Sequence, residues 1–148
     1  MKSIRIYCKN DGRYHDVPKG ATLEEVYETL DLNLPCCVTS CKVNNRVEGL
    51  HYTINDSRDL EYLTLASPSG LRTYTRSLFF VLYKAVRDLY PEAELRIGTP
   101  VAGGYFCRLT LPGGITPEVP ERLRRRMAEI VASDLPFRRV TAHTTDAI

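Results

Sequence analysis

Two groups of side chains in this chain of 148 residues have the chemical types that bind ligands, a cysteine cluster and a run of arginines. Cys36, Cys37 and Cys41 could offer thiolates to a soft metal such as zinc. Their spacing has no second cysteine pair, and the nearest histidine is His51. Because cysteine suits small buried positions on strands, we favour buried thiols over a metal site. The sequence thus assigns no catalytic, cofactor-binding or metal-binding residue.

The arginine run lies at positions 122 and 124–126. On a helix these side chains spread over most of the circumference. They could form a solvated face, paired at i, i+4 spacing with Glu118, Glu121 and Glu129, or they could bind phosphate. The net charge of +2 favours the solvated face.

Arg72 and Arg76, with Tyr74 between them, form a second basic and aromatic patch. The side chains that could contact a ligand or RNA are therefore Arg72, Tyr74, Arg76, Arg122, Arg124 and Arg125.

Motifs for other chemistry are missing from the sequence. His15, His51 and His143 are scattered and suggest no metal pair. The G-x-x-x-x-G-K pattern of a phosphate-binding loop does not occur, so this chain alone should not transfer phosphate from ATP. Five cysteines without a secretory signal indicate reduced thiols in the cytoplasm. No apolar run is long enough to predict a membrane span.

The first half of the chain is expected to form strands at residues 3–8, 14–17, 38–43, 47–50 and 60–65, and apolar and polar residues alternate at 3–8 and 60–65. Asn10-Asp11-Gly12 predicts a hairpin turn. Thr22 and Glu25 form the pattern of a capping box, and Leu23, Val26, Tyr27 and Leu30 continue a helix. The order of elements is that of a ubiquitin-like β-grasp sheet.

Ser67-Pro68-Ser69-Gly70 has the composition of a linker, so we place a domain boundary there, with domains at 1–66 and 67–148. The second half opens with a long helix ended by Pro91. Its apolar stripe is Leu71, Tyr74, Leu78, Leu82, Ala85 and Leu89.

The rest of the second half reads as two strands, a helix and a last strand. The strands fall near 95–97 and 105–111, and the helix starts near Thr116 or Val119. Its inward side chains are expected to be Leu123, Met127, Ile130 and Val131. Residues 137–141 are expected to form the last strand. Residues 144–148 look like a helix start without a helix, which we interpret as a cut from a longer protein rather than a frayed tail.

The first 66 residues resemble a TGS domain, through the helix at 22–30, the VNNRVEG turn and the closing LEYLTL strand. From Leu71 onwards the chain resembles the second domain of threonyl-tRNA synthetases, through Ser77, Leu82, Ala85, Leu89-Tyr90-Pro91, Ile97-Gly98, Gly104-Tyr105-Phe106 and Arg126-Met127. The resemblance implies an α+β chain, with a β-grasp (TGS) domain followed by an α+β domain like that shared by threonyl- and alanyl-tRNA synthetases.

In that synthetase family the long helix carries a His-Ser-x-x-His motif. Arg76 and Phe80 stand at the two histidine positions here, and no Cys-x-x-x-His follows. A remnant of a tRNA-editing hydrolase is therefore the weaker interpretation.

The segments GLRTYTRSLFFVLYKAVRDLYP and GGYFCRL resemble still more the N-terminal region of bacterial uridine kinase-like nucleoside kinases. That resemblance implies a regulatory or ligand-binding region whose kinase domain in cis lies beyond Ile148 and uses ATP and Mg²⁺. The chain alone is expected to be non-catalytic, and its oligomeric state stays open. The alternative is a stand-alone RNA-binding module related to tRNA synthetase domains, so a nucleotide or RNA is the expected partner.

Overall fold

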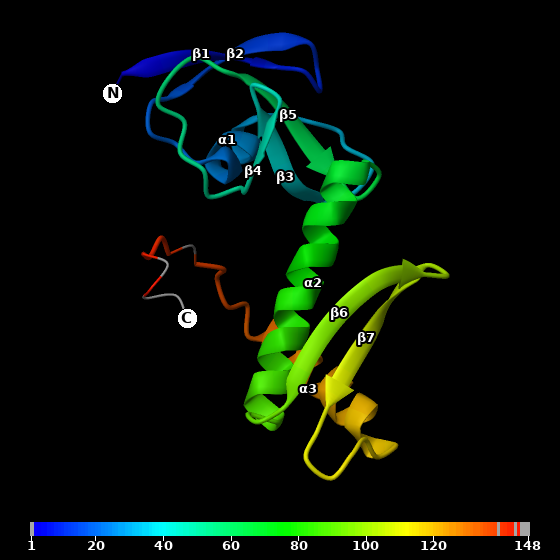
Figure 1. Ribbon diagram of the computed structural model, residues 1–148. Helices are drawn as coiled ribbons and strands as arrows, with labels where there is room; N and C mark the ends of the chain where they lie inside the picture. Colours follow the sequence, from blue (N-terminus) through cyan, green and yellow to red (C-terminus); the bar gives the residue numbers. More distant parts are fainter. Residues whose placement is uncertain (1, 139, 144, 146–148) are drawn as a thin grey trace. The chain divides into compact units, whose positions relative to one another are not determined.

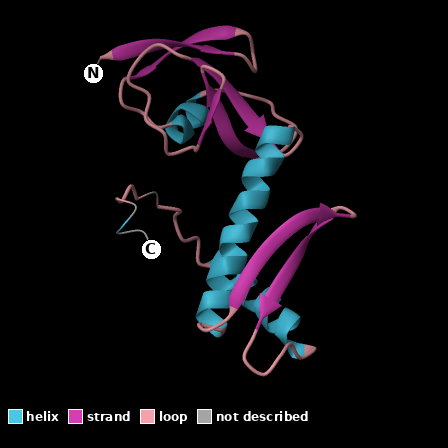
Figure 2. Cartoon of the chain, viewed as in Figure 1, coloured by secondary structure: helices cyan, strands magenta, loops and turns pink. Residues whose placement is uncertain are grey.

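The computed structural model describes residues 2–138, 140–143 and 145 (Figure 1). The chain divides into two compact units, Met1–Leu78 and Phe79–Ile148, and one helix contributes to both. Strands and helices are mixed throughout (Figure 2), which confirms the expected α+β class. The domain boundary at 66/67 stays a prediction. No helix in the described ranges has the length and apolar character needed to cross a membrane.

The first unit is a five-stranded sheet with a short helix. Its elements are β1 (Ser3–Cys8), β2 (Arg13–Pro18), α1 (Leu23–Thr29), β3 (Val38–Val43), β4 (Arg46–Glu48) and β5 (Asp59–Thr64). The strand order is β2-β1-β5-β3-β4, in which β1 and β5 run parallel and the other pairs antiparallel. This topology confirms the ubiquitin-like β-grasp prediction.

Local signals in the sequence explain how these elements form. The Glu25 amide donates to Thr22 Oγ1 at 3.2 Å, and the Thr22 amide donates to Glu25 Oε2 at 2.8 Å, so the capping box is formed. It directs Leu23 and Val26 into a core that also holds Ile6 and Leu60.

The expected linker is instead the start of a helix, because Pro68–Gly70 form the first turn of α2 (Pro68–Leu89). Proline is favoured at the first helical position, where its missing N–H costs nothing. Gly70 is buried, and its carbonyl accepts a hydrogen bond from Thr39 Oγ1 at 3.1 Å. The small residues therefore allow close packing of α2 on the sheet of the first unit.

The second unit combines the end of α2 with β6 (Glu94–Val101), β7 (Gly104–Thr110) and α3 (Glu118–Ala132). β6 and β7 form an antiparallel pair. Its buried core consists of Ala85, Val86, Val119, Leu123 and Ile130.

The expected inward position of Val131 is wrong, because this side chain is 63% exposed. On the apolar stripe of α2, Leu71, Tyr74 and Leu78 are exposed to between 37% and 50%. Helical spacing identifies the apolar face of a helix, but it does not show whether another element covers that face. On α2 only the later part of the predicted stripe packs into a core.

The predicted last strand at 137–141 is also wrong, because its described residues 137, 138, 140 and 141 have no regular structure. The Phe137 ring instead packs edge-on against the Phe80 ring, with centroids 5.8 Å apart. A strand forms only where a neighbouring strand supplies its backbone hydrogen bonds, and a local sequence signal does not provide that neighbour. The expected helix start at 144–148 falls almost wholly outside the described residues.

Candidate nucleic-acid interface

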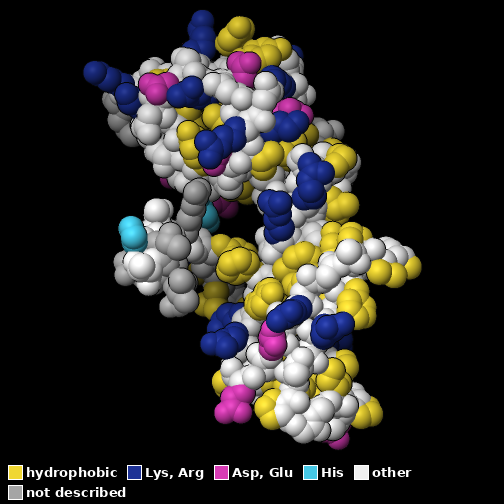
Figure 3. All heavy atoms as spheres, viewed as in Figure 1, with side chains coloured by type: hydrophobic (Ala, Val, Ile, Leu, Met, Phe, Trp, Pro, Cys, Tyr) yellow, Lys and Arg dark blue, Asp and Glu magenta, His cyan; other side chains and the backbone are white. Residues whose placement is uncertain are grey.

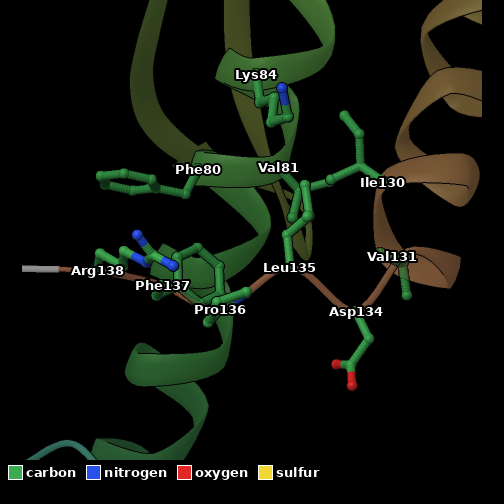
Figure 4. A pocket seen from close by; sticks show the side chains of 10 residues that line it. All are labelled: Phe80, Val81, Lys84, Ile130, Val131, Asp134, Leu135, Pro136, Phe137 and Arg138. Carbon is green, nitrogen blue, oxygen red and sulfur yellow. The ribbon is translucent and has the colours of Figure 1, made fainter.

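A pocket of about 410 Å³ opens in the second unit between α2, the end of α3 and residues 134–138. Leu135 points towards Val81 and Ile130, which together form an apolar floor (Figure 4). The floor thus joins side chains of both helices and of the segment that follows α3.

Two phenylalanine rings form one side of this pocket. Phe80 is 68% exposed and Phe137 is 55% exposed, although they meet in an edge-to-face contact at 81°. Large apolar rings are seldom left open side by side without a role in binding. An exposed ring face can stack on a planar group such as a nucleobase.

The charged groups around the rings are mainly cationic. Arg138 lies beside the Phe137 ring, across from Phe80, and no ion pair joins Arg138 to an acid within the described ranges (Figure 4). Asp134 is the one acid in the lining, and its carboxylate points away from the rings. Lys84 Nζ donates to Asp88 Oδ1 at 3.2 Å. Arg138 is therefore the cation best placed to meet an anionic group beside a stacked ring.

On the visible surface of the second unit, apolar and basic side chains lie next to one another (Figure 3). The arginine run lies on α3. Arg124 donates to both Glu121 carboxylate oxygens at 2.8 and 3.0 Å, and Arg125 lies 3.9 Å from the same carboxylate. These pairs have the geometry of the solvated, acid-paired face that we favoured.

Arg122 and Arg126 have more specific contacts. The Arg122 guanidinium lies over the Tyr90 ring, 5.5 Å from its centroid. Arg126 donates to Asp88 Oδ2 and to Glu129 Oε2, both at 2.8 Å, and so links α3 to α2. Arg126 therefore positions the helices that form the pocket.

Asp88 gives this link a pH dependence. Hydrogen bonds from Arg126 and then Lys84 hold the pKa of its carboxyl below the ordinary value. A depressed pKa stabilises the folded state above the unfolded pKa of about 4, and this contribution is lost as pH falls through the folded pKa. We expect Asp88→Asn to lower the thermal midpoint at neutral pH, with the difference from wild type shrinking in acid.

Circular dichroism melts across this pH range measure the effect. Glu92→Gln is the matched control, because no ion pair of Glu92 occurs in the described part of the chain. A difference between Asp88→Asn and wild type that is constant with pH would contradict the expectation.

The six side chains expected to contact a ligand are divided between the two units. Arg72, Tyr74 and Arg76 belong to the first unit, on the first half of α2, where all three are exposed. Arg72 donates to Ser69 Oγ at 2.8 Å. Arg122, Arg124 and Arg125 belong to the second unit, on α3. Their role in binding stays a prediction.

Sequence reasoning missed the aromatic pocket. From the sequence, Phe80 is only the replacement of a histidine, and Phe137 belongs to a predicted strand. An exposed phenylalanine on the polar side of an amphipathic helix was the signal available, since Phe80 falls off the apolar stripe of α2.

The cysteines are not equivalent. Cys41 is buried, and burial raises the pKa of its thiol to about 12. Cys37 is exposed and Cys36 half-buried, so the expectation of buried thiols on strands fits Cys41 alone. In the described ranges no three His, Cys, Asp or Glu side chains are grouped to hold a metal ion.

Comparison with known proteins gives a consistent result along the whole chain. No protein family model matches it. Over 145 residues, 98% of its length, it is 32% identical to the threonine–tRNA ligase of Desulforamulus reducens and 31% identical to that of Clostridium novyi. Over 139 residues, 94% of its length, it is 32% identical to the threonine–tRNA ligase of Rubrobacter xylanophilus. The chain spans 23%, 23% and 21% of these proteins, under a quarter of their length.

The prediction of a nucleoside kinase is therefore wrong. The resemblance to threonyl-tRNA synthetases, which was also noted in the sequence, extends over 98% of the chain. A kinase domain in cis is therefore unsupported, and the ATP and Mg²⁺ expected with it stay an untested prediction. The error arose because the two resemblances share the same two domains, and the missing phosphate loop is equally expected of both.

Proposed function

We propose that this chain is a tRNA-binding, non-catalytic region related to threonine–tRNA ligases. The observation that carries the proposal is the pocket in which the open rings of Phe80 and Phe137 lie beside Arg138. Rings that stack on bases and an arginine that meets phosphate are the two elements with which proteins hold unpaired nucleotides. The similarity to threonine–tRNA ligases favours tRNA as this nucleic acid.

The lining of the pocket favours binding over hydrolysis. Its ten described side chains include no histidine, cysteine, serine or threonine, so they offer no hydroxyl or thiol nucleophile and no imidazole base. The carboxylate of Asp134 is turned away from the rings. This supports a pocket that holds a nucleotide without cleaving it.

The salt dependence of tRNA binding tests the proposal. We expect fluorescence anisotropy of labelled tRNA to show affinity falling steeply between about 50 and about 200 mM salt. Arg138→Ala should weaken binding and reduce the slope of log K against log salt by about 1, the value for one phosphate contact. Lys19→Ala, an exposed cation of the first unit, is the matched control.

Binding that does not change with salt, or a slope that Arg138→Ala leaves as in the wild type, would contradict the pocket as a nucleotide site. Failure to bind tRNA at low salt would contradict the proposed function itself.

A further inference from the structure

The β6–β7 pair has an inner and an outer face with different chemistry. On the inner face Leu95 and Leu109 pack on the core of the second unit, and the Tyr105 ring meets the Phe79 ring at 4.8 Å. Side chains alternate along a strand, so Arg96, Phe106 and Arg108 lie on the opposite, outer face. None of them lines the pocket at Phe80 and Phe137.

Two arginines are direct partners on this outer face. Arg96 pairs with Arg108 in the antiparallel register, which places both side chains on the same side of the ribbon. Like charges directly opposite one another destabilise a sheet. Arg96 is partly neutralised by Glu94, whose Oε1 accepts from its Nε at 2.7 Å. Arg108 has no ion pair with an acid in the ranges that the structure describes. An anion between the two guanidinium groups would relieve this repulsion.

A phenylalanine lies next to these charges. Phe106 is 56% exposed and precedes Arg108 by two residues on the same face. The register shifts between Ile97 and Pro100, opposite Phe106. There Gly98 leaves the ring uncovered, since a Cβ at this position would lie 3.5 Å from Phe106 Cδ1 and 3.3 Å from the Phe106 carbonyl oxygen. The outer face therefore combines an open ring with two adjacent cations.

We propose that the outer face of β6–β7 binds single-stranded RNA, with Phe106 stacked on a base and Arg96 and Arg108 holding the adjoining phosphate. This second contact surface rests on the proposed RNA-binding function and is separate from the pocket. The two arginines favour a polyanion as the partner. The exposed Phe106 ring favours a polyanion with unpaired bases, because bases in a duplex are not free to stack on a side chain.

The test uses the full chain carrying Phe137→Ala, which removes one of the two rings of the pocket and so lowers its share of the binding. A short fluorescent oligoadenylate is titrated against this chain and against the same chain with Phe106→Ala or Arg108→Ala added. We expect Phe106→Ala to weaken binding about tenfold, the scale of one stacked base. Arg108→Ala should also weaken binding, and it should reduce the slope of log K against log salt by about 1, the value for one phosphate contact. Thr110→Ala, on the same face of β7, is the matched control and should leave the affinity unchanged.

Each other outcome has a distinct meaning. If Phe106→Ala and Arg108→Ala leave oligoadenylate binding unchanged, or if Phe137→Ala alone abolishes it, the outer face does not bind RNA, while the pocket can still do so. If polyglutamate displaces the oligonucleotide as well as unlabelled RNA does, the face recognises acidic chains in general and the inference is overturned. If the wild-type chain binds neither oligoadenylate nor tRNA, the proposed function fails together with this inference.

Discussion

Replacing Phe137 with alanine is expected to weaken tRNA binding by about tenfold, because stacking on an aromatic side chain contributes about 1–3 kcal/mol per base. Phe80→Ala should have an effect of similar size. Both rings are more than half exposed, so their removal should change binding far more than folding. Because the rings touch, with centroids 5.8 Å apart, the double variant should lose less than the product of the two effects.

Anisotropy titrations with labelled tRNA measure this loss. The matched control is Ile115→Ala, which removes an apolar side chain of similar exposure, 57%, that does not line the pocket. Far-ultraviolet circular dichroism of each variant checks that the fold is kept. Affinities within about twofold of the wild type for both phenylalanine variants would show that no base stacks there, since a lost stack costs more.

Gly70→Ala is expected to destabilise the first unit by about 3 kcal/mol, the upper part of the range for overpacking. A Cβ at this position would overlap the Thr64 carbonyl oxygen and lie 2.8 Å from the Thr64 carbonyl carbon and 2.9 Å from Thr39 Oγ1. The nearest obstacles are backbone atoms of β5, which cannot rotate away. Helix propensity alone would give the opposite sign, a gain of about 1 kcal/mol from glycine to alanine.

Urea unfolding monitored by tyrosine fluorescence gives the free energy of unfolding for this comparison. Gly49→Ala is the control, because a Cβ there meets no atom within 4 Å, and we expect it to be neutral or slightly stabilising. A Gly70→Ala variant as stable as the wild type would show that α2 does not pack on β5 as closely as the structure has it.

The fold of the first unit could be predicted because its signals are local. The turn at Gly12, with φ of +70°, the asparagines Asn44 and Asn45 with φ of 47° and 69°, and the capping box at Thr22 are each encoded within four residues. The parallel pairing of β1 with β5 is not local, and it followed only from the order of the elements.

The pocket could not be predicted, because it depends on contacts between distant parts of the chain. Phe80 and Phe137 meet only because α3 returns along α2, where Arg126 binds Asp88. The composition of Pro68–Gly70 predicts a linker, although the same small residues permit α2 to pack closely against Thr64 of β5. The local sequence at 137–141 likewise could not show that the Phe137 ring packs against Phe80 of α2.

Ultraviolet cross-linking of the chain to tRNA, followed by mass spectrometry of the peptides, tests tRNA binding and its location together. We expect cross-linked nucleotides on the peptides that contain Phe80 and Phe137, and their loss when both residues are replaced by alanine. Cross-links confined to other peptides, or no cross-links at low salt, would contradict the pocket as the tRNA site.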